Sequence, residues 1–151
     1  MASLRIGDQA PEFELEGTGG HTYRLVDYRR NGVILAFYPG DFTPVCTKQF
    51  CSYRDNDDRI QALGIPMLGI SPQSVDSHER FTTEHGLSVP LLSDPDKSVA
   101  RSYGVLGPAG MIRRSIFLVD ADGLVRYRHV AMLGLRFQDV GDLEQAVSQL
   151  S

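Results

Sequence analysis

The two cysteines of this 151-residue chain, Cys46 and Cys51, are its strongest candidates for chemistry. They lie close together at the start of a helical pattern that follows Pro44. Proline is favoured in the first turn of a helix, and Thr43 is a good N-cap residue. We therefore expect Cys46 in the first turn, where unpaired backbone N–H groups and the helix dipole favour an anion. A thiol there reacts readily as its thiolate, so Cys46 is a candidate nucleophile.

The spacing of the two cysteines limits how they can react with each other. Five residues correspond to about 140° around a helix and about 7.5 Å along it, which separates the two Cα atoms by about 8.7 Å. A disulfide tolerates no more than about 7 Å. A Cys46–Cys51 bond therefore requires the first turns of the helix to unwind.

Other interpretations of the cysteine pair remain open from residue types alone. Two unrelated buried cysteines can act simply as small hydrophobic side chains. A dithiol reductase is disfavoured because four residues separate the pair, in place of the two of a Cys-x-x-Cys motif. A metal site is also disfavoured, because the four histidines show no ligand spacing (His21, His78, His85 and His129).

Hydrophobic periodicity predicts alternating strands and helices around this stretch. The order β-β-β-α-β-α-β-α-β-β-α predicts an α/β fold, a mixed central sheet flanked by helices, with an N-terminal β-hairpin turning at Gly17–Gly20. The whole chain, residues 1–151, is expected to be one domain. Strands are expected over 13–15, 22–25, 33–38, 66–71, 90–94, 115–119 and 124–130, and helices over 44–63, 74–86, 94–103 and 139–150.

The loop from Pro39 to Cys46 leaves the carboxyl end of the apolar run Val33–Tyr38. A continuous apolar run is typical of a strand covered on both faces, and sites in such sheets lie beyond the carboxyl ends of strands. This placement favours an active site at the loop. Helical spacing also puts Cys46 on one stripe with Phe50 and Tyr53, so its side chain is expected to face the core.

The composition of the chain limits which cellular compartment and which binding partners are expected. A net charge of -4 favours neither nucleic acid nor an anionic membrane as partner. The amino-terminal residues lack an apolar signal-peptide core, and no run approaches the roughly 20 residues of a membrane span. Two cysteines do not form a disulfide scaffold. We therefore expect a cytoplasmic protein.

The spacing Pro39-x-x-x-Thr43-x-x-Cys46 resembles the motif of the peroxiredoxins, which are thiol peroxidases built on the thioredoxin fold. The longer stretch 43–55 is similar to the bacterioferritin comigratory protein, or PrxQ, subgroup, where a resolving cysteine follows the peroxidatic cysteine by five residues. The similarity covers about residues 5 to 150. It includes Gly7–Pro11, Ser71–His78, Pro90–Asp96, Tyr103–Val105 and Arg114–Asp120.

The resemblance implies a role for each residue of the motif. Cys46 would attack hydrogen peroxide or an alkyl hydroperoxide and become a sulfenic acid, and Cys51 would resolve it as a disulfide. Thr43 would donate a hydroxyl, Pro39 would shield the pocket, and Arg114 would stabilise negative charge. Thioredoxin or a glutaredoxin-like dithiol would regenerate the enzyme, with no cofactor or metal.

Several choices stay open at this stage. Arg113, next to Arg114 in the sequence, is the alternative candidate for the arginine of the site. Gln49 either orients this arginine or lies at the surface. Tyr38 and Phe42 either line the pocket or pack in the core. The alternatives for function are a one-cysteine peroxidase and a non-enzymatic redox sensor or holdase. A monomer is expected, and a weak dimer is the alternative.

Overall fold

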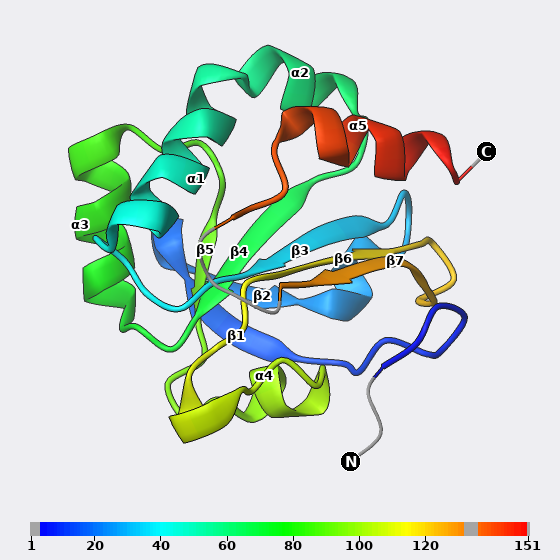
Figure 1. The fold of residues 1–151 in the computed structure, drawn as a ribbon, viewed down its shortest axis with the longest axis horizontal. Coiled ribbons are helices and arrows are strands. Elements are labelled where there is room, and N and C mark those ends of the chain that lie inside the picture. Colours follow the sequence, from blue (N-terminus) through cyan, green and yellow to red (C-terminus); the bar gives the residue numbers. More distant parts are fainter. Residues whose placement is uncertain (1–3, 132–135, 151) are drawn as a thin grey trace.

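In the computed structural model, which describes residues 4–131 and 136–150, seven strands form one sheet in the order β2-β1-β5-β4-β3-β6-β7 (Figure 1). The central strands β3, β4 and β5 are parallel, and the other neighbouring pairs are antiparallel. The predicted mixed sheet and N-terminal hairpin are therefore confirmed. The strands are β1 Glu14–Gly17, β2 His21–Arg24, β3 Val33–Phe37, β4 Met67–Ser71, β5 Leu91–Ser93, β6 Ser115–Val119 and β7 Val125–Val130.

Helices cover both faces of the sheet (Figure 1). On one face, α1 (Pro44–Asp55), α2 (Asp57–Ala62), α3 (Val75–His85) and α5 (Val140–Ser148) contribute to a core cluster that includes Phe50, Phe81 and Leu143. On the other face, α4 (Ser98–Ser102) contributes Val99 to a second cluster. Short 3-10 turns span Thr18–Gly20, Leu25–Tyr28 and Pro108–Gly110. Within the described residues, no helix is long and apolar enough to cross a membrane.

The single helix expected over 44–63 is wrong, because the chain forms two helices that meet at Asn56. The backbone of Asn56 leaves the helical region, at φ -114° and ψ 31°. Its side-chain amide donates to the Ser52 carbonyl, while its own carbonyl accepts the N–H groups of Arg59 and Ile60. A short polar side chain that competes with the backbone for hydrogen bonds favours such a break. The buried stripe still continues across the break to Ile60.

The other helix starts depend on acidic and hydroxyl caps. Ser74 caps α3 by accepting the N–H of Ser77, and Asp139 forms a capping box with Asp142 at the start of α5. The helix expected from 94 begins only at Ser98. The Asp94 carboxylate nevertheless accepts the N–H groups of Val99 and Ala100, so it acts as a cap from outside the helix.

The strand register brings two distant segments together at one edge of the sheet. Phe37, at the carboxyl end of β3, pairs with Ser115, at the start of antiparallel β6. The loop that follows β3 therefore lies beside Arg114, which immediately precedes β6. The Arg114 carbonyl accepts the N–H of Ala131, so the backbone of Arg114 is held in place. This register positions the loop, the start of α1 and an arginine in one place.

Candidate active site

Thr43 occupies the N-cap position of α1, with extended backbone at φ -75° and ψ 149°. The position is as expected, but among the described residues its side chain makes no capping bond. The Thr43 hydroxyl turns back and donates to the Gly40 carbonyl at 3.1 Å. Thr43 therefore leaves the N–H groups of the first turn uncapped by its side chain. These are the groups that favour an anion at a helix start.

Cys46 and Arg114 are in direct contact in the core. The Cys46 side chain is completely buried, and Arg114 is only 5% exposed. The Arg114 Nη1 group donates to Cys46 Sγ at 3.2 Å. The Arg114 guanidinium and the start of α1 thus both direct N–H groups and positive charge toward this sulfur. The adjacent Arg113 is half-buried, and its backbone N–H bonds to the Val105 carbonyl.

A chain of hydrogen bonds extends from Arg114 along α1. Arg114 Nη1 also donates to Gln49 Oε1 at 2.6 Å, and Gln49 Nε2 donates to the Tyr53 hydroxyl at 3.0 Å. The Tyr53 hydroxyl in turn donates to the Gln138 carbonyl at 2.6 Å. Burial raises the pKa of Tyr53 far above its usual range, which keeps this hydroxyl protonated. Of the two alternatives for Gln49, the structure therefore favours the buried partner of the arginine over the surface position.

Both cysteines are free thiols in the described part of the chain, and both lie in α1. Cys51 is half-buried and lies two residues after Gln49 in α1. The intact helix separates the two residues as the sequence geometry requires. Pro39 is half-buried at the start of the loop. Tyr38 is fully buried, whereas Phe42 is 44% exposed and packs edge-on against Phe81.

Sequence reasoning missed several residues around this site. Tyr53 was expected only as an apolar member of the helix stripe, and Gln138 was not singled out. Asp41 and His78 were not paired, although they are buried against each other behind the loop. The available signal in the sequence was an aspartate inside the loop motif from Pro39 to Cys46. Its partner was not identifiable, because it lies 37 positions away on α3.

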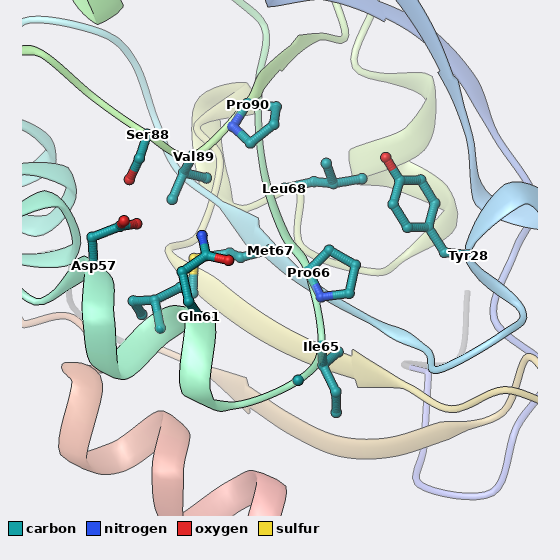
Figure 2. A pocket seen from close by; sticks show the side chains of 12 residues that line it. Tyr28, Asp57, Gln61, Ile65, Pro66, Met67, Leu68, Ser88, Val89 and Pro90 are labelled. Carbon is teal, nitrogen blue, oxygen red and sulfur yellow. The ribbon is translucent and has the colours of Figure 1, made fainter.

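A cavity of about 380 Å³ lies at the opposite edge of the sheet, by the amino ends of β4 and β5 (Figure 2). Asp57 and Gln61 approach it from α2, and Ser88 and Pro90 from the segment before β5. None of the predicted site residues lines it. Among the described residues, no three His, Cys, Asp or Glu side chains are arranged to hold a metal ion.

Comparison with known proteins identifies the family. The AhpC/TSA family profile matches residues 6–128. A putative peroxiredoxin of Mycobacterium tuberculosis is 41% identical over 129 residues, which cover 81% of this chain and 82% of the relative. Peroxiredoxin Bcp of Escherichia coli is 37% identical over 134 residues, or 84% of this chain and 86% of the relative.

Solved structures agree with this result across nearly the whole chain. Peroxidoxin BcpB of M. tuberculosis superposes with a TM-score of 0.83 at 30% identity, covering 97% of this chain and 96% of that one. The bacterioferritin comigratory protein of Xanthomonas campestris gives a TM-score of 0.85 at 25% identity, covering 99% of both chains. The predicted thioredoxin fold is thereby confirmed. This chain belongs to the AhpC/TSA family and is a peroxidase, a peroxiredoxin of the bacterioferritin comigratory type.

Proposed function

We propose that the chain reduces hydrogen peroxide and organic hydroperoxides with Cys46 as the peroxidatic cysteine. The observation that carries this proposal is the 3.2 Å contact from Arg114 to the Cys46 sulfur at an uncapped helix start. In the first step the thiolate forms an S–O bond with the peroxide and the O–O bond breaks. Water or an alcohol leaves after taking up a proton, and Cys46 becomes a sulfenic acid.

Arg114, Thr43 and Pro39 support this first step. The guanidinium of Arg114 stabilises the developing charge on the leaving oxygen. Its buried Nε group has no hydrogen-bond partner among the described residues, so it is a spare donor for a peroxide oxygen. The Thr43 hydroxyl donates to a peroxide oxygen if it rotates away from Gly40. Pro39 limits access of water to the sulfur.

Cys51 completes the cycle as the resolving cysteine. Its sulfur attacks the sulfenic sulfur of Cys46, an S–S bond forms, and water leaves. The helix geometry requires α1 to unwind locally between the two cysteines. A dithiol such as thioredoxin, or a glutaredoxin-like protein, then reduces the disulfide by exchange. We place this cycle in the cytoplasm, where such reductants keep thiols reduced, and in a monomer.

Peroxide consumption coupled to thioredoxin, thioredoxin reductase and NADPH tests the proposal. Wild type is expected to turn over, Cys46→Ser is expected to be inactive, and Cys51→Ser is expected to lose thioredoxin-dependent turnover. Trypsin cleaves after Lys48 and so separates the cysteines into different peptides. After peroxide, mass spectrometry is expected to find these peptides joined by a disulfide within one chain.

The alternatives give different results in the same experiments. Full turnover by Cys51→Ser, with a stable sulfenic acid on Cys46, would establish a one-cysteine peroxidase and leave Cys51 a packing role. Rapid oxidation of Cys46 without turnover by any donor would establish a redox sensor or holdase. Activity retained in Cys46→Ser would contradict the whole mechanism.

A further inference from the structure

A buried polar cluster lies directly behind the loop that carries Thr43. Asp41 is 5% exposed, and its carboxyl group has three hydrogen-bond partners. Oδ1 accepts from the Tyr38 hydroxyl at 2.7 Å, Oδ2 accepts from Ser77 Oγ at 2.7 Å, and Oδ2 also lies 2.7 Å from His78 Nδ1. The partners come from the residue that follows β3 and from α3.

His78 is completely buried and has an acceptor at each ring nitrogen. Nδ1 faces the Asp41 carboxylate, and Nε2 lies 3.0 Å from the Leu92 carbonyl on β5. The imidazole therefore links the Asp41 carboxyl group of the loop to the Leu92 carbonyl of β5. Asp41 and His78 form a buried hydrogen-bonded pair that bridges the loop and β5.

The loop needs such an anchor because its backbone is strained. Phe42, between Asp41 and Thr43, has φ +64°, a left-handed conformation that costs energy in a bulky side chain. The Thr43 hydroxyl is bonded to Gly40, on the other side of Asp41. The direction of Thr43 and the first turn of α1 thus depend on where Asp41 is held. Strained residues persist only where the surrounding structure fixes them.

We propose that Asp41 and His78 are positioning residues for peroxide reduction, and that their buried hydrogen-bonded pair holds the Thr43 loop in its reactive geometry. This inference rests on the proposed function of Cys46. Among the described contacts neither residue bonds to Cys46, so the pair acts through Thr43 and the start of α1.

Tyr38 and Ser77 complete the surroundings of the Asp41–His78 pair. The Tyr38 oxygen also lies 3.3 Å from His78 Nδ1. Burial, followed by the charge and hydrogen bond of Asp41, raises the pKa of Tyr38 well above its usual range. Tyr38 therefore stays a neutral donor. The groups facing His78 are the Asp41 carboxyl group from the loop, the hydroxyl of Tyr38 just after β3, and the Leu92 carbonyl from β5.

The test compares two reactions of the reduced Cys46 thiol. Alkylation by iodoacetamide needs only an accessible thiolate, whereas peroxide reduction also needs the donors around the sulfur to be aligned. In His78→Gln and in the milder Ser77→Ala, we expect the rate of sulfenic acid formation to fall. The expected loss is on the order of 10- to 100-fold for His78→Gln, as for a small misplacement of reacting groups, and smaller for Ser77→Ala. The alkylation rate of the Cys46 peptide is expected to stay near that of wild type.

Tyr103→Phe is the matched control. The Tyr103 hydroxyl is lost from the other face of the sheet, where it donates to the Pro11 carbonyl at 2.7 Å. The Tyr103→Phe substitution thus removes a buried tyrosine hydrogen bond without touching the loop. The rates of sulfenic acid formation and of alkylation are both expected to be unchanged. A proportional fall of both rates in His78→Gln, or no fall in either, would overturn the positioning role.

Nitrogen-15 NMR of the imidazoles in the unmodified protein gives a measurement that does not depend on any variant folding. A His78 Nδ1 resonance that carries the shift of a hydrogen bond to a carboxyl group is expected, and an Nδ1 resonance without such a hydrogen bond would overturn the Asp41–His78 pair. Failure of the proposed function is recognised separately. In that case wild type itself would form no sulfenic acid on Cys46, before any variant is compared.

Discussion

Removing the Tyr53 hydroxyl is expected to loosen the helix that must unwind during the cycle. This hydroxyl accepts from Gln49 and donates to the Gln138 carbonyl, and the ring is completely buried. Tyr53→Phe leaves both partners without their bond in a dry site, at a cost of about 2 kcal/mol in the free energy of unfolding. For a chain of this size, that lowers Tm by about 4–8 °C.

The same substitution is expected to speed disulfide formation. Tyr53 lies two residues after Cys51 and ties α1 to the segment before α5. If half or more of this roughly 2 kcal/mol destabilises the folded helix α1 relative to its locally unwound state, the unwound state becomes about 5- to 30-fold more populated. Conversion of sulfenic acid to disulfide should accelerate by up to this factor. Quenched-flow trapping with dimedone, followed by mass spectrometry, measures the rate.

Tyr103→Phe serves as the control for this prediction also, because its hydroxyl lies on the opposite face of the sheet. Its Tm is expected to fall while its rate of disulfide formation stays at the wild-type value. The reasoning is refuted if Tyr53→Phe lowers Tm but closes the disulfide no faster than Tyr103→Phe.

Two further changes test the arginine and the β6–β7 turn. Arg114→Lys keeps the charge but loses the planar guanidinium, whose Nη1 group donates to both Cys46 and Gln49. We therefore expect kcat/KM for peroxide to fall on the order of 10²-fold or more, while Arg113→Lys should change it little. Burial opposes ionisation of Asp120, but bonds from Arg126 and from the backbone N–H groups of Leu124 and Asp122 outweigh it and lower its pKa. A lowered pKa adds stability that is present above the unfolded value of about 3.9 and is lost as pH falls through the folded value. The Tm advantage of wild type over Asp120→Asn should therefore shrink below about pH 4, and a constant difference in thermal scans down to pH 2 would contradict this.

The strands of the sheet were predictable because each is determined by residues that are neighbours in the sequence. The apolar run Val33–Phe37 and the turn at Gly123 define their elements without reference to distant residues. The placement of Arg114 was also accessible, since the residue precedes a recognisable strand. What the sequence did not reveal is each contact whose partner lies far along the chain. The Tyr53 hydroxyl bonds to a carbonyl 85 positions away, and His78 reaches a carboxylate 37 positions away.

The direction of the Thr43 hydroxyl illustrates the same limit at short range. Threonine before a helix normally bonds to the N–H groups of the first turn. Here the hydroxyl bonds back to Gly40, in a loop whose shape includes the left-handed Phe42 and the buried Asp41. The competing bond depends on that loop geometry, and the loop depends on α3 and β5. Local propensity therefore identified the cap residue but not the use of its side chain.

The contacts that align Cys46 also oppose the next step of the proposed cycle. Arg114 holds the sulfur and Gln49 together, and Tyr53 fastens the same helix to the Gln138 segment. Stronger contacts keep the thiolate aligned for peroxide but leave a sulfenic acid longer beyond the reach of Cys51. During that time a second peroxide can oxidise the sulfur to sulfinic acid. The stability of α1 thus determines how the sulfenic acid divides between disulfide and overoxidation, and a variant that loosens the helix should resist inactivation by excess peroxide.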